Sequence, residues 1–270
     1  MVRTVADETE RRWVDSMPAA YEQLLVPTVF QPFAVDLARR VAADDPEAVL
    51  ELAAGTGALT AALVAAGVGS LVATDLNAAM VELGRVGVPD ADWHQADAAD
   101  LPFGLSTFDA VACQFGVMFF PDKPAAFAQV RRVLAEDGVF RFNTWAPVET
   151  HDFAAALTAG LERAFPDDPP TFVAAVPHGY TDPDLIEGDL AAGGLLVDEM
   201  ATVTVAGHAA SARDVAVGFC LGTPVRAAIE QRDDLDQAIE VVAEAMEERL
   251  GTGPVIGHMT AYVVAASPAD

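Results

Sequence analysis

Apolar positions in the middle of the chain follow two different spacings. Short apolar runs, typical of buried strands, are separated by longer stretches in which apolar residues recur every three or four positions, as on one face of a helix. The predicted strands cover 48–52, 71–74, 92–95, 109–114 and 139–143, and the predicted helices between them cover 58–66, 78–84 and 123–135. Strands that alternate with helices form parallel βαβ units, so this region predicts a doubly wound, Rossmann-like α/β sheet.

The pattern on either side of this region is mostly helical. We predict helices over 7–25, 32–43, 151–165, 182–193, 212–221 and 224–250, and two late strands over 199–205 and 259–265. The late strands are expected to pair antiparallel at one edge of the sheet. The complete prediction is a seven-stranded, mostly parallel sheet with an antiparallel edge strand.

These elements predict a single domain over residues 1–270. Residues 1–45 supply N-terminal helices, residues 46–145 form the core of the sheet, and residues 195–270 complete it with further helices. Between them, residues 146–194 are rich in apolar side chains and in Pro, with no clean periodicity after the first helix. We expect this segment to form a helical cap over the active site.

Charge and cysteine content narrow the expected partners. Fifteen basic residues against 41 acidic residues give a net charge of −26, which repels phosphate backbones and anionic membrane surfaces. No stretch predicts a transmembrane helix, and the N-terminus lacks the apolar segment of a secretion signal. Cys113 and Cys220 form neither a disulfide framework nor a zinc-binding spacing. We therefore expect a cytoplasmic protein with no metal, no nucleic acid and no membrane insertion.

A glycine-rich turn joins the first predicted strand of the sheet to a helix. In Glu51-Leu52-Ala53-Ala54-Gly55-Thr56-Gly57 the two glycines permit positive φ and close approach of a ligand, and the helix that follows offers free N–H groups. Asp75 ends the second predicted strand, where an acidic residue can accept hydrogen bonds from ribose hydroxyls. Two simpler interpretations remain open: the glycines serve only the turn, and Asp75 caps the next helix, a role for which Asn77 is better placed.

Two more polar positions follow the next predicted strands. Asp97 comes after the third strand, where its carboxylate can accept a hydrogen bond from the amino group of an adenine, although it is also an ordinary residue for a loop. Gln114 ends the fourth strand, at the carboxyl edge where doubly wound sheets bind their ligands.

In this order, the four stretches resemble class I S-adenosylmethionine (SAM)-dependent methyltransferases, specifically the type 11 or UbiE-like small-molecule group. The resemblance covers about residues 21–145 and includes Leu101-Pro102-Phe103 and Phe108-Asp109-Ala110-Val111. It implies SAM as cofactor, S-adenosylhomocysteine as product, and methyl transfer to an O, N or C nucleophile of a small molecule.

The resemblance also implies a role for each cofactor-side position. Glu51 orders the loop and the methionine amino group, Gly55 and Gly57 admit the cofactor, and Asp75 holds the ribose. The other implied cofactor contacts are Ala53 and Thr56 in the loop, Leu76 and Met80 flanking the adenine, Asp97 and Ala98 at its edge, Gln114 and Phe115 beside the methionine portion, and Tyr21 and Phe30 closing over the cofactor. Tyr21 and Phe30 are equally interpretable as core aromatics.

Departures from the family pattern leave alternatives open. The family often has Asp where Glu51 stands and Cys where Ala54 stands. Thr60 occupies the position that a dinucleotide fingerprint gives to Gly or Ala, which weakens the rival interpretation as an NAD(P)-dependent oxidoreductase. A non-catalytic SAM-binding protein is the other alternative.

The acceptor side has no clear motif. Methyl transfer is an in-line displacement, so a general base is needed only for a poorly nucleophilic acceptor. His151 and His178 lie in or beside the predicted cap and are the candidate bases, although either can be a packing residue. Apolar residues in the cap favour a hydrophobic acceptor, while neither its identity nor the oligomeric state follows from the sequence.

Overall fold

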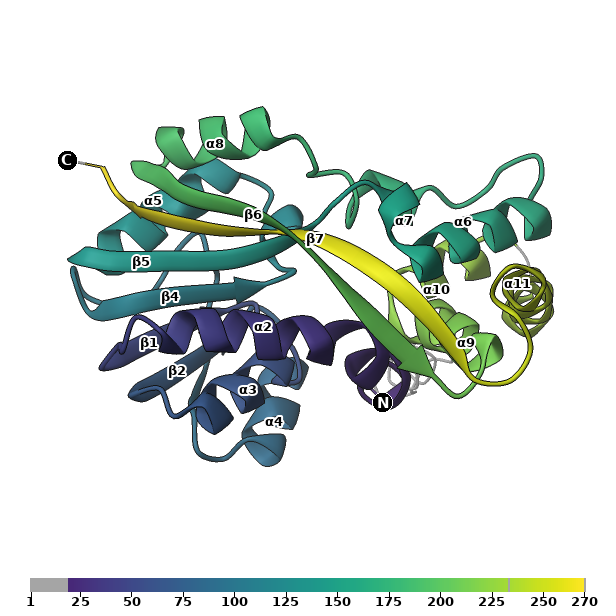
Figure 1. The fold of residues 1–270 in the computed structure, drawn as a ribbon, viewed down its shortest axis with the longest axis horizontal. Helices are drawn as coiled ribbons and strands as arrows, with labels where there is room; N and C mark the ends of the chain where they lie inside the picture. The colour runs from purple at the N-terminus through teal and green to yellow at the C-terminus, as the bar shows by residue number, and fades with distance from the viewer. Residues whose placement is uncertain (1–18, 233, 270) are drawn as a thin grey trace, which may run out of the picture. The chain divides into compact units, whose positions relative to one another are not determined.

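The structure is a computed structural model that describes residues 19–232 and 234–269 (Figure 1). These residues divide into two compact units. One, here called the sheet unit, comprises Gln31–Pro147, Val176–Val205 and the described residues from Thr260 onward. The other, here called the helical unit, comprises the described residues up to Phe30 and those of Val148–Ala175 and Ala206–Met259. No helix of the described residues is long and apolar enough to cross a membrane.

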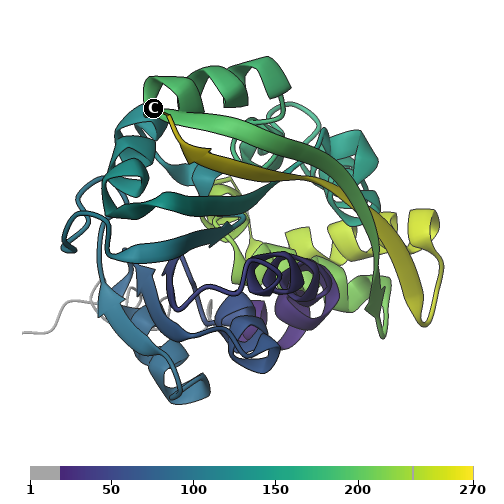
Figure 2. The same cartoon turned by 60° about the vertical axis from the view of Figure 1, so that its left-hand side comes forward.

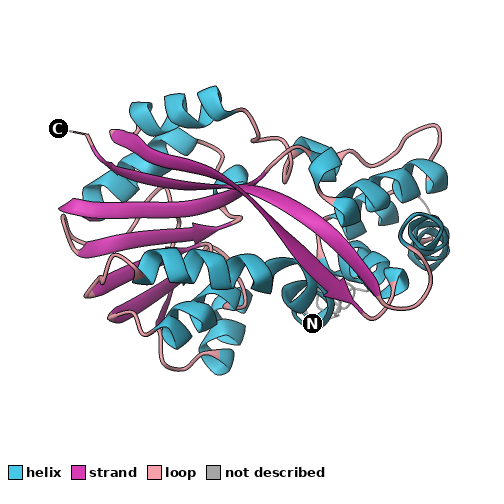
Figure 3. Cartoon of the chain, viewed as in Figure 1, coloured by secondary structure: helices cyan, strands magenta, loops and turns pink. Residues whose placement is uncertain are grey.

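Seven strands form one sheet in the order β3-β2-β1-β4-β5-β7-β6 (Figure 3). They are β1 (Ala48–Leu52), β2 (Ser70–Asp75), β3 (Asp92–Gln95), β4 (Phe108–Gln114), β5 (Leu134–Trp145), β6 (Leu195–Ala209) and β7 (Val255–Pro268). The first five pair in parallel, whereas β7 runs antiparallel to β5. The predicted fold class is therefore confirmed, with β7 placed between β5 and the edge strand β6.

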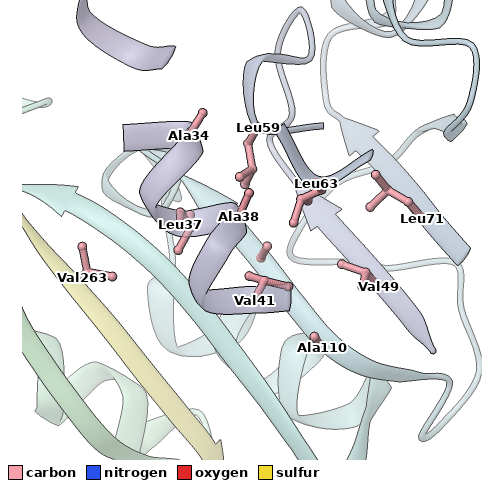
Figure 4. Packing of buried hydrophobic residues seen from close by; sticks show 11 residues of the cluster. Ala34, Leu37, Ala38, Val41, Val49, Leu59, Leu63, Leu71, Ala110 and Val263 are labelled. Carbon is pink, nitrogen blue, oxygen red and sulfur yellow. The ribbon is translucent and has the colours of Figure 1, made fainter. Parts of the chain in front are cut away.

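Helices cover both faces of the sheet unit. They are α2 (Gln31–Ala42), α3 (Ala58–Ala66), α4 (Ala78–Gly87), α5 (Lys123–Val133) and α8 (Pro183–Ala192), with a 3₁₀ turn η2 (Val117–Phe119) after β4. On one face, Leu37 and Val41 of α2 pack with Leu63 of α3 over the strands (Figure 4). All three side chains are fully buried, so this layer contributes strongly to the hydrophobic stabilisation of the sheet.

The alternation of side chains along β5 separates the two faces. Phe140 and Phe142 point to one face, where Phe127 of α5 packs against both rings. Arg141 points to the other face and pairs with Asp44, which follows α2. Figure 2 shows α5 and α2 on different sides of the strands.

The helical unit contains the other helices of the described residues. They are the π-helix η1 (Tyr21–Phe30), the 3₁₀ turn η3 (Val148–Thr150), α6 (Asp152–Ala164), α7 (Phe172–Ala175), α9 (Ala212–Gly222), α10 (Val225–Glu230) and α11 (Leu235–Leu250). α6 and α11 pack closely because Gly160 has no side chain: a Cβ there would lie 3.1 Å from the backbone of Val242.

Two predicted helices differ from those observed. The prediction of one helix over 224–250 is wrong, since the Asp234 carboxylate accepts the N–H of Gln237 and starts α11 separately from α10. The helix predicted over 7–25 begins outside the described residues, and its end at Leu25 is wrong because η1 continues to Phe30. Pro27 lies inside η1, where the wider π turns accommodate a residue that has no N–H to donate.

The fifth strand and the two late strands are longer than predicted. Asp137 and Gly138, which precede the predicted strand 139–143, lie inside β5. The pairing of β5 with β4 shifts register at this point, so the two residues form an irregularity in the strand rather than its boundary. The segment 146–194, predicted as one cap, is shared between the two units: Val148–Ala175 belongs to the helical unit, and the chain from Val176 belongs to the sheet unit.

Candidate active site

The glycine-rich turn between β1 and α3 has an unusual backbone. Ala53, Gly55 and Gly57 have φ values of 52°, 56° and 101°. A positive φ at Ala53 is costly for a residue with a side chain, and such conformations cluster at ligand-binding sites. A Cβ at Gly57 would lie 3.2 Å from the ring of Trp93, which packs beneath the turn, so a side chain there would crowd this ring as well as strain the backbone.

Asp75, at the end of β2, holds this turn in place. One carboxylate oxygen accepts the N–H of Gly55 at 2.8 Å, and the other accepts the N–H of Asn77 at 2.8 Å. The cap of α4 is Asn77, whose side chain accepts the N–H of Ala79. The interpretation of Asp75 as a plain helix cap is therefore excluded, and its role toward a ribose stays a prediction.

Glu51 is buried at the end of β1, directly before the turn. Its side chain is 1% exposed, and its Oε2 has no hydrogen-bond partner among the described residues. Burial, with a smaller effect of the Asp75 charge, raises the pKa of Glu51 to about 8, although Thr60 in the first turn of α3 partly opposes the shift. Burial at this position therefore favours the neutral form of the Glu51 carboxyl group.

The predicted adenine-side residues lie at the same edge of the sheet. Leu76 is 65% exposed immediately after β2, and Met80 is half-buried in the first turn of α4. Asp97 is exposed after β3, where its carboxylate accepts the N–H of Ala99 at 2.9 Å, and Ala98 between them is half-buried. The structure brings these positions to the carboxyl edge, as expected, and leaves their adenine contacts as predictions.

The ends of β4 and β5 carry a cluster of aromatic side chains. Phe115, which follows Gln114, has a φ of 49°, and its ring stacks on Trp145 with centroids 3.7 Å apart and planes 7° apart. Phe33 packs edge-on against both rings. Gly116, which follows Phe115, permits a close approach to the glycine turn, since a Cβ there would lie 2.6 Å from the Cβ of Ala53.

Asn143 of β5 is a site residue that the sequence analysis missed. It is fully buried, and its Oδ1 accepts the N–H of Phe115 at 3.0 Å. Its backbone carbonyl accepts the same N–H at 3.2 Å. A polar amide inside the apolar run Val139–Trp145 was the available signal, because a buried amide requires hydrogen-bond partners.

The two candidate histidines belong to different units. His151, in the helical unit, caps α6: its Nδ1 accepts the N–H of Ala154 at 3.2 Å. His178, in the sheet unit, donates from Nδ1 to the carbonyl of Ala146 at 2.7 Å, and its ring lies 5.8 Å from that of Trp145. His151 thus has a structural role as a helix cap, and His178 lies beside the aromatic cluster. A role as base stays a prediction for both.

The segment that carries His178 is fixed to the sheet by its neighbour Tyr180. The Tyr180 hydroxyl donates to Asp189 of α8 at 2.9 Å, and its carbonyl accepts the hydroxyl of Thr144. The ammonium of Lys123 lies 4.8 Å from the centre of the Tyr180 ring. Burial, followed by the Asp189 carboxylate, raises the pKa of Tyr180, so its hydroxyl remains a donor.

Tyr21 and Phe30 belong to the helical unit, at the two ends of η1. Their ring centroids are 4.9 Å apart. This packing is consistent with their interpretation as core aromatics, and their contact with a cofactor stays a prediction.

The glycine turn fits a polar ligand. The N-cap of α3 is Gly57, and no side chain of the described residues caps the first N–H groups of this helix. Within the described residues, the buried Oγ1 of Thr56 and Oε2 of Glu51 have no hydrogen-bond partner. A Cβ at Gly55 would meet nothing within 4 Å, so the turn presents open backbone to a ligand. The site offers both donors and acceptors to a zwitterionic amino acid or a nucleoside.

Comparison with known proteins agrees with this geometry. A family model described as a methyltransferase domain matches residues 49–138, from β1 to the irregularity in β5. This part of the chain is similar to methyltransferase domains. A demethylmenaquinone methyltransferase of Clavibacter sepedonicus is 37% identical over 130 residues, which cover 46% of this chain and 53% of the relative. The chain thus spans about half the length of the curated relatives it matches.

Two solved structures share the fold of this chain. The YcgJ protein of Bacillus subtilis has a TM-score of 0.55 at 19% identity, and the aligned region covers 88% of this chain and 99% of that protein. A Haemonchus contortus phosphoethanolamine N-methyltransferase, solved with phosphomonomethylethanolamine and S-adenosylhomocysteine, has a TM-score of 0.61 at 14% identity. The aligned region covers 100% of this chain and 61% of the Haemonchus protein. The resemblance to class I, UbiE-like methyltransferases is confirmed.

Proposed function

We propose that this protein transfers the methyl group of SAM to a small-molecule acceptor. The observation that carries the proposal is the extent of the methyltransferase match, residues 49–138. The match includes the polar residues at the carboxyl ends of the strands β1 to β4, from Glu51 to Gln114. The matched segment therefore contains the glycine turn and the polar residues of the candidate site.

The residues of the sheet unit fit SAM. The turn at Gly55 and Gly57 would hold the amino-acid portion near Glu51, Asp75 would accept hydrogen bonds from the ribose, and Asp97 with Ala98 would contact the adenine edge. SAM supplies a methyl group activated by its sulfonium. The protein's part is to hold the acceptor in line with that methyl group and to exclude water, which the aromatic side chains at Phe115 and Trp145 favour.

The sheet order weighs against the oxidoreductase alternative. The usual dinucleotide-binding sheet has the order 3-2-1-4-5-6 with parallel strands. Here β7 runs antiparallel to β5 and separates it from β6. Thr60 is fully buried in α3, at the position where a dinucleotide fingerprint has a small residue.

For the acceptor we propose a hydrophobic, quinone-like molecule. The name of the Clavibacter relative supports this class, and so does the aromatic cluster at Phe33, Phe115 and Trp145. The net charge of −26 argues against a nucleic-acid acceptor. The predicted cytoplasmic location belongs to the same proposal, and the oligomeric state is left open.

Calorimetric titration of the purified protein with SAM, S-adenosylhomocysteine and NADH tests the cofactor. We expect one SAM or S-adenosylhomocysteine per chain and no heat from NADH. Binding of NADH without binding of either sulfur ligand would overturn the proposal. Transfer of labelled methyl from SAM into a metabolite extract then identifies the acceptor, and binding without any transfer to any extract would favour a non-catalytic SAM-binding protein.

A further inference from the structure

Glu51 is a buried carboxyl group with an unfilled hydrogen-bonding site. It is the penultimate residue of β1, is 1% exposed, and has an Oε2 with no partner among the described residues. Leaving a buried charged oxygen without a donor is strongly unfavourable, and a carboxyl group in this position avoids that cost by taking up a proton.

The ionisable groups around Glu51 do not compensate its charge. Asp75 approaches from the end of β2 and Cys113 from β4, and each interacts with Glu51 electrostatically. Burial raises the pKa of the Cys113 thiol, so that group is neutral. The charge of Asp75 has the same sign as that of an ionised Glu51 and therefore opposes its ionisation. Thr60 of α3 favours the ionised form of Glu51 only in part, and the pKa of Glu51 remains at about 8. No basic group is among those that act on Glu51 in the described part of the chain.

A cationic ligand group would change this balance. Glu51 immediately precedes the open turn at Gly55, where a ligand approaches the backbone closely. An ammonium placed against a carboxyl group favours the ionised form and supplies the donor that Oε2 lacks.

We propose that Glu51 is a carboxylic acid in the ligand-free protein and ionises when the ammonium of the cofactor's amino-acid portion binds beside it. The O–H bond of Glu51 breaks, the proton leaves to the solvent, and the carboxylate then pairs with the ligand ammonium. Binding of the amino-acid portion is thereby coupled to proton release, whereas a ligand without an ammonium binds with no such release. The inference rests on the proposed function, because it requires a SAM-type ligand at the turn.

Proton linkage gives the expected size of the effect. With its pKa at about 8, Glu51 binds about 0.9 proton at about pH 7 and about 0.5 proton at about pH 8 before the ligand arrives. Complete ionisation in the complex releases those amounts. The apparent affinity for the ligand is then about fivefold weaker at about pH 7 than at about pH 8, because the proton competes with the ligand.

The test is calorimetry of S-adenosylhomocysteine binding in two buffers of different ionisation enthalpy, since the difference in heat counts the protons released. 5′-Methylthioadenosine, which lacks the amino-acid portion, is the matched ligand control. Glu51→Gln is the matched protein control, because it keeps the shape and removes the proton, and any proton exchange of the ligand itself appears equally in this variant. We expect release of most of a proton at about pH 7 from wild-type protein with S-adenosylhomocysteine, and none beyond background in either control.

The outcomes separate the inference from the proposed function. If S-adenosylhomocysteine binds with the same proton count to wild type and Glu51→Gln, or if 5′-methylthioadenosine releases as many protons, the inference is overturned and the proposed function stands. If neither ligand binds, both are overturned. Infrared difference spectra of ligand-free wild type against Glu51→Gln at about pH 6 provide a direct check: a carboxylic acid C=O band that only wild type shows supports the inference, and its absence overturns it.

Discussion

The carboxyl ends of β1, β2 and β3 are held mainly by hydrogen bonds between backbone N–H groups and short polar side chains, whereas the ends of β4 and β5 are held mainly by aromatic packing. In the first region, here called the polar half, Asp75 alone accepts the N–H groups of Gly55 and Asn77. In the second, here called the aromatic half, Phe115 stacks on Trp145, and His178 is held beside them.

This difference indicates how each half tolerates change. A polar half built from backbone N–H groups and single carboxylates depends on the identity of one or two side chains and on glycine conformations. An aromatic half built from large buried rings depends on volume, and related rings can substitute for one another at moderate cost. A fixed polar half and an adaptable aromatic half are suited to one cofactor and to different acceptors.

Truncation of Trp145 should have the largest effect on stability. Trp145→Ala removes a buried ring from its stack with Phe115 and should lower the free energy of unfolding by about 3–5 kcal/mol. Trp145→Phe is the matched control, and it should lose clearly less because it keeps an aromatic ring in the stack. Urea unfolding measures both. Equal losses for the two variants would contradict the view that ring volume holds this half together.

Asp75 provides the next largest effect, on binding rather than on folding. Asp75→Ala removes charged hydrogen bonds worth about 1.5–3 kcal/mol, which corresponds to a loss of about ten- to a hundredfold in affinity for S-adenosylhomocysteine. Asp109→Ala is the matched control. Asp109 likewise accepts two backbone N–H groups, those of Glu47 and Ala48, but at the opposite end of β1.

Calorimetric titration of the two variants separates the roles. Asp109→Ala should cost stability and leave the affinity unchanged, because it lies far along the strand from the turn. Equal affinity losses in the two variants would mean that Asp75 acts only by supporting the fold, and unchanged affinity in both would remove Asp75 from the binding site.

The polar half could be predicted from the sequence because its contacts are short-range or follow from strand order. The predicted strand 92–95 has the same limits as β3, and Asn77 caps α4 two residues from Ala79. The aromatic half could not, because it depends on distant pairs. Asn143 meets Phe115 across 28 residues, and His178 meets Ala146 across 32. No local pattern at Asn143 specifies its partner, and the cap segment 146–194 gave no periodicity that would divide it between two units.

A smaller effect on the polar half comes from the support beneath the glycine turn. Gly84 of α4 lies against the ring of Trp93, and a Cβ there would overlap that ring. Gly84→Ala should therefore lower the free energy of unfolding by about 1–3 kcal/mol and weaken cofactor binding, since Trp93 also packs under Gly57. Gly87→Ala, on the same helix with nothing within 4 Å, should be neutral or slightly stabilising. Thermal unfolding and titration with S-adenosylhomocysteine distinguish them, and similar behaviour of the two variants would refute the packing argument.

The smallest predicted effect concerns the side chains that fix the His178 segment in the aromatic half. Lys123, the only lysine of the chain, lies over the ring of Tyr180 and donates to the carbonyl of Phe120 at 3.1 Å. Lys123→Met keeps the apolar stem and removes the charge, so the free energy of unfolding should fall by about 0.5–1 kcal/mol. Lys123→Arg is the control that retains a cation, and urea unfolding compares the three proteins.

Affinity for S-adenosylhomocysteine should not change in either variant, because Lys123 acts on the segment of Tyr180 and His178 and not on the polar half. A loss of affinity in Lys123→Met as large as that in Asp75→Ala would show that the two halves are energetically coupled, and the division between a fixed polar half and an adaptable aromatic half would then fail.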